Sequence, residues 1–255
     1  MPEGVTMRNP SSKRPTIPRQ QRLSEMVAGT IGKRIVTGHY KPGDTLPTEP
    51  EVQAEFGVSR TAVREAIRQL AAKGLTASRP KIGTRVRPSG DWNMFDADVL
   101  RWQVEHGPTD EFVNALFEMR EIIEPSAASL AAERATADDI TALGIAMDGI
   151  ESHPRGGAEQ ISSDIDFHMT ILTASRNPIL ISVGAMINSA LELTFTIGWR
   201  TVMAADSVLQ HRAVYEMIAA RDAEGAFYGM RRLLRNSKGN VLDALKATRA
   251  HQEPV

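Results

Sequence analysis

Apolar residues recur at helical spacing along nearly the whole of this 255-residue chain. Leu23, Val27 and Ile31 begin the first such stripe, and from Thr109 onward nearly every segment repeats the pattern. A strand-like pattern is confined to residues 75–86. Because hydrophobic periodicity is the main indicator of secondary structure, we predict a mainly α fold with one small β-hairpin.

Charge is divided unevenly along the sequence. Residues 1–88 hold 16 lysines and arginines against 7 aspartates and glutamates, whereas residues 89–255 hold 14 against 24. The formal net charge of −1 therefore combines a part of +9 with a part of −10. A basic segment of this size is typical of a protein that binds nucleic acid. We predict that the basic and acidic parts form separate domains.

The amino-acid sequence disfavours several classes of protein. The chain has no cysteine, which excludes disulfide scaffolds, thiolate metal ligands and cysteine catalysis. Residues 1–18 are polar and proline-rich, so we predict no secretory signal and a cytoplasmic protein. The long apolar stretch Ile179–Trp199 is interrupted by Ser182, Asn188 and Glu192, and a charge at mid-span is costly in lipid. We predict one buried helix there and no membrane partner.

The basic part contains two helices joined by a tight turn. Thr48 carries the signal of a helix start, and Gly57 that of a helix end. Ser59 follows after a single residue and is suited to capping a further helix that runs to Lys73. Two helices with so short a connection predict a helix-turn-helix.

The second of these helices presents arginines on one face. Arg60, Arg64 and Arg68 are spaced by four, opposite the apolar stripe, with Thr61 beside them. Guanidinium groups can bind guanine edges or phosphates, and hydroxyls such as that of Ser59 suit phosphate oxygens at a helix N-terminus. A single arginine taken alone is more often a solvated surface charge, and it is the combination of the helices, the tight turn and the one-sided arginines that favours DNA binding.

A hairpin follows these helices. Residues 75–78 and 84–86 have strand character, and the turn between them carries Arg79, Lys81 and Gly83. Cations at such a tip can neutralise DNA phosphates. Helix, turn, helix and hairpin together predict a winged helix-turn-helix domain.

This part of the sequence resembles the GntR family of DNA-binding regulators. The matching runs are Gly38–Gly43, Leu46–Glu49, Phe56–Ala66, Lys73–Leu75 and Gly83–Val86. The resemblance implies that Ser59, Arg60, Thr61, Arg64 and the wing tip contact double-stranded DNA. It also implies a palindromic operator bound by a homodimer. One difference is Pro50, which stands where many relatives have a phosphate-contacting arginine.

The predicted domains are a flexible arm at 1–18, the winged helix-turn-helix at 19–88, a partly helical linker at 89–108 and an all-helical domain at 109–250. Breaks between the helices of the last domain are expected at Thr136, 153–157, Asn177–Pro178, 204–207 and Arg221–Asp222.

Three ionisable residues of the acidic part form a candidate metal site. Asp164 and His168 are one helical turn apart and share a face, so they can hold one divalent cation. His211 is the candidate third ligand. An exposed hydrogen-bonded Asp–His pair, with His211 as a surface or satisfied core histidine, is the alternative.

The same region resembles the FCD effector domain of the FadR branch of the GntR superfamily. The matching runs are Glu118–Glu124, Asp164–His168, Ala174–Pro178, His211 and Asp222–Glu224. The resemblance implies a divalent cation, often zinc or nickel, bound by Asp164, His168 and His211, with a carboxylate effector beside it. The family's fourth ligand position is occupied by Leu233.

The effector site is expected around Arg120, which matches the family's inward-pointing arginine and can bind a carboxylate in bidentate fashion. A surface salt bridge with Glu124 is the alternative. Polar residues that would line the cavity are Asn188, Ser189, Trp199 and Arg200. The predicted effector-binding set is Arg120, Asp164, His168, Asn188 and His211. The run from Trp92 to Trp102 resembles regulators of D-galactonate and related sugar-acid operons, so a sugar acid is the preferred ligand.

We therefore predict a ligand-responsive repressor of a sugar-acid or other carboxylate catabolic operon, released from DNA by its effector. One alternative is a metal-dependent hydrolase with a DNA-binding appendage, but the sequence lacks His-Glu-x-x-His and Gly-x-Ser-x-Gly motifs. A second alternative is an architectural DNA-binding protein whose helical part only dimerises.

Overall fold

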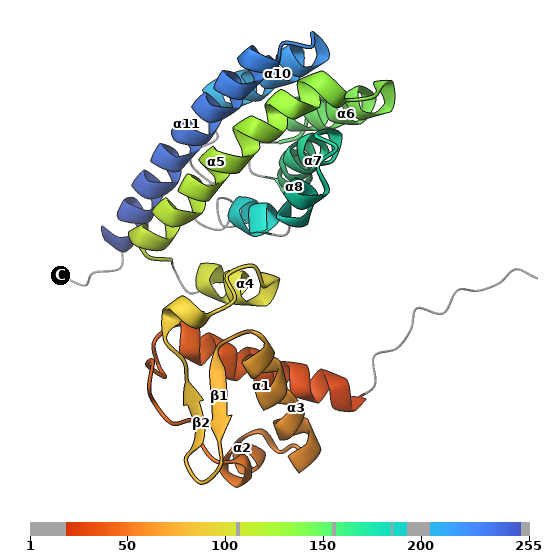
Figure 1. The fold of residues 1–255 in the computed structure, drawn as a ribbon. Helices are drawn as coiled ribbons and strands as arrows, with labels where there is room; N and C mark the ends of the chain where they lie inside the picture. The colour runs from red at the N-terminus through yellow and green to blue at the C-terminus, as the bar shows by residue number, and fades with distance from the viewer. Residues whose placement is uncertain (1–18, 106–107, 155–156, 185, 193–204, 251–255) are drawn as a thin grey trace, which may run out of the picture. The chain divides into compact units, whose positions relative to one another are not determined.

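The computed structural model describes residues 19–105, 108–154, 157–184, 186–192 and 205–250 (Figure 1). They form two compact units, one containing the chain up to Ile35 together with Tyr40–Asp91 and the other containing Val36–His39 together with the chain from Trp92. Helices dominate both units and the described strands number two, which confirms the mainly α class.

The first unit is a winged helix-turn-helix. Its elements are α1 (Arg19–Val36), α2 (Glu49–Phe56), α3 (Arg60–Ala72), β1 (Thr76–Arg79), β2 (Gly83–Val86) and the 3-10 turn η1 (Ser89–Asp91). The predicted capping box is present, because the Glu51 carboxylate accepts hydrogen bonds from the Thr48 N–H at 2.7 Å and the Thr48 hydroxyl at 2.8 Å. Gly57 ends α2 in the left-handed conformation, with φ 63°.

The wing is an antiparallel pair in which Thr76 faces Val86 and Arg79 faces Gly83. Lys81 lies in the connecting turn with φ 64°, and Gly83 follows with φ 93°. Both positions need backbone conformations that are unusual for side-chain-bearing residues. The wing and α3 share a core in which the side chains are fully buried: Val63, Ala66, Leu70 and Leu75.

The second unit is a helical bundle. Its elements are α4 (Ala97–Glu105), α5 (Asp110–Arg134), α6 (Ala137–Ser152), α7 (Ala158–Ala174), α8 (Pro178–Ser182), α10 (Ala205–Ala219) and α11 (Ala223–Ala250), and residues 186–192 are also helical. Figure 1 shows α5 and α11 side by side. Ion pairs Arg235–Glu121 at 3.1 Å and Arg249–Asp110 at 2.7 Å show that these two helices are antiparallel.

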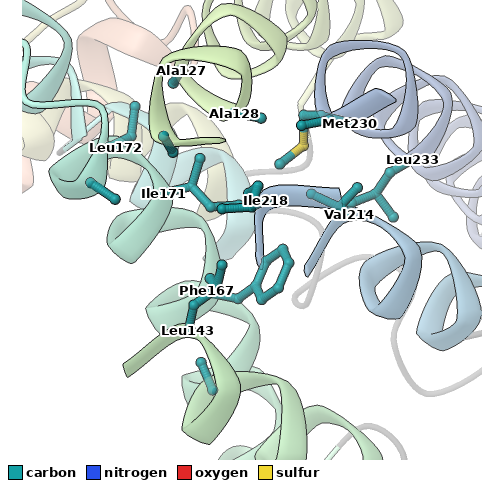
Figure 2. Close-up of a cluster of buried hydrophobic side chains, with 14 of the residues drawn as sticks. Ala127, Ala128, Leu143, Phe167, Ile171, Leu172, Val214, Ile218, Met230 and Leu233 are labelled. Carbon is teal, nitrogen blue, oxygen red and sulfur yellow. The ribbon is translucent and has the colours of Figure 1, made fainter. Parts of the chain in front are cut away.

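The bundle core is built on small residues of α5. Ala127, Ala128, Ala131 and Ala132 are fully buried, and they pack with side chains from α6, α7, α10 and α11 (Figure 2). Methyl side chains allow neighbouring helices to approach α5 closely. Helix α4 contributes to a second hydrophobic cluster, in which Leu100 and Val104 pack with Val113 and Phe117 of α5.

The prediction of one buried helix over Ile179–Trp199 is wrong. Helix α8 ends at Ser182, and the Ile179 side chain is 73% exposed. Gly184 follows, and a Cβ there would meet the Met169 side chain at 2.5 Å. The residues of this segment are apolar almost throughout, so hydrophobic periodicity cannot show where one helix ends and the next begins. Residues 193–199 lie outside the described residues. Among those described, no helix combines the length and apolar character needed to cross a membrane.

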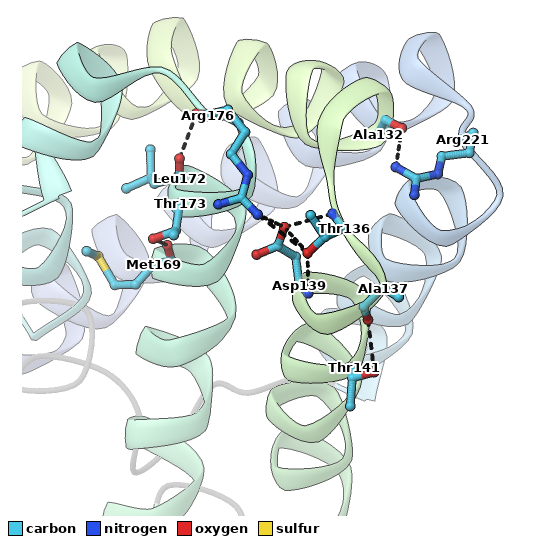
Figure 3. A network of polar contacts seen from close by, with 11 residues as sticks. Ala132, Thr136, Ala137, Asp139, Thr141, Met169, Leu172, Thr173, Arg176 and Arg221 are labelled. Atoms are coloured by element: carbon cyan, nitrogen blue, oxygen red, sulfur yellow. Dashed lines mark hydrogen bonds and ion pairs between the residues drawn. The ribbon is translucent and has the colours of Figure 1, made fainter.

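Two arginines in left-handed conformations connect helix ends in the bundle (Figure 3). Arg176, with φ 53°, follows α7 and contacts the Asp139 carboxylate and, at 3.4 Å, the Thr136 hydroxyl at the start of α6. Arg221, with φ 63°, follows α10 and donates to the Ala132 carbonyl of α5 at 3.2 Å. Each arginine satisfies polar groups at the end of another helix, which offsets its backbone strain.

The Thr136–Asp139–Arg176 contacts generate a stability prediction. Asp139→Asn should lower the free energy of unfolding by about 1 kcal/mol at pH 7, the usual contribution of an N-terminal cap. Burial raises the pKa of Asp139, but hydrogen bonds from Thr136 and the charge of Arg176 outweigh this effect and lower it. The stabilisation is therefore present above the unfolded pKa of about 4 and is lost as pH falls below it.

Thermal unfolding followed by circular dichroism at pH 7 and pH 3 measures this effect. Asp138→Asn, an exposed aspartate in the same turn, is the matched control. Equal melting temperatures for the two variants at pH 7 would contradict the assigned role of Asp139.

Candidate functional site

The predicted DNA-reading face of α3 is open to solvent. The side chains of Arg60, Arg64 and Arg68 are 72%, 69% and 73% exposed. Ser59 precedes the helix and its hydroxyl accepts the Ala62 N–H at 3.3 Å, as expected of a cap. The long arginine side chains project from a helix whose other face is buried, which is the arrangement needed to enter a DNA groove.

Acidic partners of these arginines were not recognised from the sequence. Glu49 of α2 lies 2.9 Å from Arg60 Nε and 3.9 Å from Arg64 Nε, and Glu65 lies 2.6 Å from Arg68. The Glu65–Arg68 spacing is visible in the sequence, but the Glu49 contacts depend on how α2 and α3 pack. Exposed pairs of this kind contribute little to stability, so DNA phosphates can replace the carboxylates at small cost.

A groove of about 720 Å³ lies between α1 and this face of α3. Its lining residues are Gln20, Gln21, Ser24, Thr61, Arg64, Glu65 and Arg68. Arg79, Lys81 and Gly83 do not line it; they are exposed at the end of the hairpin. The predicted DNA-binding residues therefore occupy two surfaces of the first unit, the α3 face and the wing.

The second unit brings Asp164 and His168 of α7 together with His211 of α10. One potential ligand atom from each residue lies within 4.8 Å of the others. The three residues are only 4%, 3% and 3% exposed, so the alternative of an exposed Asp–His pair is wrong. A carboxylate and two imidazoles are ligands that zinc and nickel accept.

The orientation of these groups fits a shared cation. His211 Nε2 lies 2.9 Å from Asp164 Oδ1, but the two atoms are not aligned as a hydrogen bond. His211 Nδ1 lies 2.7 Å from the Ser207 carbonyl, which fixes the ring and leaves Nε2 facing the cluster. Burial raises the pKa of Asp164, but the neighbouring His211 and His168 lower it overall, so the carboxylate is held ionised.

Arg120 and Glu124 of α5 form a buried extension of this cluster. Arg120 Nε donates to Glu124 Oε1 at 2.5 Å, and Glu124 Oε2 lies 2.5 Å from His168 Nδ1. The alternative was a surface salt bridge with Glu124. The salt bridge is present, but its two side chains are only 1% and 2% exposed, so it is buried rather than on the surface. Burial raises the pKa of Glu124, but Arg120 and His168 lower it to about 2.

One guanidinium nitrogen of Arg120 remains available. Arg120 Nη1 is buried and has no hydrogen-bond partner among the residues that the structure describes. An unsatisfied buried donor is costly. A carboxylate ligand would satisfy it, in keeping with the expected anion site.

Other predicted effector residues are placed differently. Asn188 is partly exposed and donates to Glu192 Oε1 at 3.0 Å rather than to the cluster. Ser189 is buried. Leu233 is 2% exposed and belongs to the apolar core. Trp199 and Arg200 lie outside the described residues. The contact of Glu124 with His168 was not foreseen, because it joins two helices that are distant in sequence.

A winged helix-turn-helix with an open arginine face, in one chain with a helical bundle that buries a cluster of ionisable side chains, is the arrangement of a DNA-binding regulator with a second, helical domain. The sequence matches "Bacterial regulatory proteins, gntR family" over residues 23–86 and "FCD domain" over residues 115–236. The chain therefore belongs to the GntR family of bacterial transcriptional regulators, with an FCD domain, and it is a regulator rather than an enzyme.

Relatives and a solved structure agree with this assignment. YieP of Escherichia coli (strain K12), named as an uncharacterized HTH-type transcriptional regulator, is 35% identical over 85% of this chain and 94% of its own. The galactonate operon transcriptional repressor of the same organism is 32% identical over 80% of this chain and 90% of its own. Lar of Listeria monocytogenes, whose structure is solved, shares the fold with a TM-score of 0.60, at 19% identity over 87% of this chain and 97% of its own.

The α3 face generates a binding prediction. Arg64→Ala should weaken binding to a specific DNA site by about 1–3 kcal/mol, since it removes a guanidinium that can read a base edge. If the arginine contacts a phosphate instead, the slope of binding against log salt should fall by about 0.9. Fluorescence anisotropy on a fragment selected by the wild type from a random-sequence library measures both quantities.

The control is Arg101→Ala, which removes an exposed arginine of α4 whose guanidinium lies 2.5 Å from Asp98. Retention of full affinity and an unchanged salt slope in Arg64→Ala would remove this residue from the DNA interface.

Proposed function

We propose that this regulator is a repressor of a sugar-acid or related carboxylate catabolic operon and that the effector releases it from a palindromic operator. The observation that carries the proposal is the buried Arg120, whose Nη1 is unpartnered among the described residues and whose Nε is fixed by Glu124. The similarity of this chain to the galactonate operon transcriptional repressor supports a sugar acid as the ligand. We also propose that it acts in the cytoplasm, because a bacterial regulator must reach the DNA that it binds.

The proposal assigns the DNA-binding domain to residues 19–88, the linker to 89–108 and the effector domain to 109–250. The family matches at 23–86 and 115–236 support this division. We also propose a homodimer, because a palindromic operator requires two symmetry-related recognition helices. A coupling free energy of about 1–3 kcal/mol between the effector site and the DNA-binding domain is sufficient, because it changes operator affinity about 5- to 150-fold.

The proposal includes one divalent cation, zinc or nickel, bound by Asp164, His168 and His211. The donor types, the burial of all three residues and the Ser207 contact of His211 support it. When bound, the cation would supply a positive charge and open coordination positions for an oxygen-rich ligand.

A metal measurement tests this part. Protein dialysed against Zn²⁺ and then against buffer should retain about one ion per chain, because three buried donors form one site. His168→Ala and His211→Ala should each lose most of it, as read by inductively coupled plasma mass spectrometry. His153→Ala, a partly exposed histidine at the end of α6, should retain the ion. Wild-type protein without stoichiometric metal would refute the site.

The effector site is tested with Arg120→Lys. Alanine would leave Glu124 buried without its partner and lower the free energy of unfolding by about 3–5 kcal/mol. Lysine keeps the positive charge but cannot bind a carboxylate in bidentate fashion as a guanidinium does. The variant should still bind DNA but should need at least about 10-fold more D-galactonate for release, the loss expected from one charged hydrogen bond. Anisotropy of the operator complex against D-galactonate concentration measures this response.

The control is Arg212→Lys, which alters an arginine paired with Glu151 on the α6 side of α10. If wild type ignores a panel of sugar acids, hydroxy acids and acyl compounds, an effector-independent architectural role is favoured. If Arg120→Lys responds as wild type does, Arg120 is not the anion site.

A further inference from the structure

Glu124 contacts two functional side chains at once. One carboxylate oxygen accepts from Arg120 Nε at 2.5 Å. The other lies 2.5 Å from His168 Nδ1, although these two atoms are not aligned as a hydrogen bond. All three side chains are at least 97% buried. Arg120 holds the carboxylate from its own helix, four residues away, so that the second oxygen is directed across to α7.

A carboxylate oxygen this close to Nδ1 bears on which nitrogen of His168 can bind a cation. A neutral imidazole carries its proton on one nitrogen and offers a lone pair on the other. An ionised carboxylate only accepts hydrogen bonds, so it favours the proton on Nδ1 and leaves Nε2 for a cation. The Ser207 carbonyl, 2.7 Å from His211 Nδ1, does the same for the second histidine.

We propose that Glu124 is a positioning residue, which fixes His168 as the Nδ1–H tautomer and so prepares its Nε2 for the cation. This inference rests on the proposed metal site. Arg120 then has two roles, because it orients Glu124 through Nε while Nη1 remains available to the effector carboxylate.

The pairing with Arg120 supports a carboxylate at this position. The guanidinium lies 2.5 Å from one Glu124 oxygen, and both side chains are buried. A carboxylate paired in this way only accepts hydrogen bonds, so it favours a proton on the histidine nitrogen that it faces.

Glu124→Gln gives a specific test. The glutamine oxygen should keep accepting from Arg120 Nε, so its amide N–H would face His168 and would donate to Nδ1. That arrangement moves the histidine proton to Nε2 and blocks the ligand nitrogen. We expect the ¹⁵N NMR signals of His168 in metal-free protein to change from the Nδ1–H to the Nε2–H pattern. Zn²⁺ affinity by competition with a chromogenic chelator should fall about 10- to 100-fold.

Two further variants make the result interpretable. Glu118→Gln removes an exposed carboxylate of the same helix and should alter neither reading. Glu124→Asp keeps the charge and should keep the Nδ1–H pattern, with a smaller loss of Zn²⁺ affinity than glutamine. A helix-packing role alone would change melting temperature but not the tautomer.

The outcomes separate the two proposals. Wild type that binds no Zn²⁺ overturns the metal site and this inference with it. Wild type that binds Zn²⁺, combined with wild-type tautomer and affinity in Glu124→Gln, overturns the positioning role and leaves the metal site standing.

Discussion

The helical unit is organised around ionisable groups that it removes from water. Arg120, Glu124, Asp164, His168 and His211 are all buried, and they come from three helices, α5, α7 and α10. Burial of isolated charges is strongly unfavourable, so each group must find a partner of suitable geometry. The packing of these helices is thus tied to the contacts among the five side chains, which leave Arg120 Nη1 and His211 Nε2 without hydrogen-bond partners among the described residues. Apolar side chains at these positions would often give a core of equal stability, but such a core would offer no polar groups to a ligand.

The two units use charge in different ways. On α3 the arginines are exposed and their carboxylate partners, Glu49 and Glu65, are exposed as well. Water screens such pairs, so they exchange readily for phosphates. In the bundle the Arg120–Glu124 pair is desolvated and cannot exchange at low cost. The first arrangement suits reversible DNA binding, and the second suits a buried site with a fixed arrangement of charges.

Local signals made the DNA-binding unit predictable from sequence. The Thr48 capping box, Gly57, the Ser59 cap and the turn at Lys81 all act within a few residues, and each is present in the structure. The bundle was predictable only where residues share a helix face, as with Asp164 and His168. Glu124 reaches His168 across two helices, and Asn188 turns towards Glu192. Neither can be derived from spacing, because both depend on how α5, α7 and the 186–192 helix pack.

The charge count of the proposed pocket relates the cation to the effector. Histidines that bind a cation do so as neutral ligands. Among the remaining side chains of the cluster, Arg120 is offset by Glu124 and Asp164 leaves a net charge of −1, which repels a carboxylate. A bound divalent cation changes the net charge to +1, and one carboxylate then makes the buried site neutral. Because an uncompensated charge is costly at this depth, cation and monocarboxylate should each favour the binding of the other. Leu233 occupies the family's fourth ligand position and cannot bind a cation. Three protein donors would leave coordination positions open for the hydroxyl and carboxylate oxygens of a sugar acid. A dicarboxylate would give the proposed site a net negative charge again, so the site should favour singly charged acids.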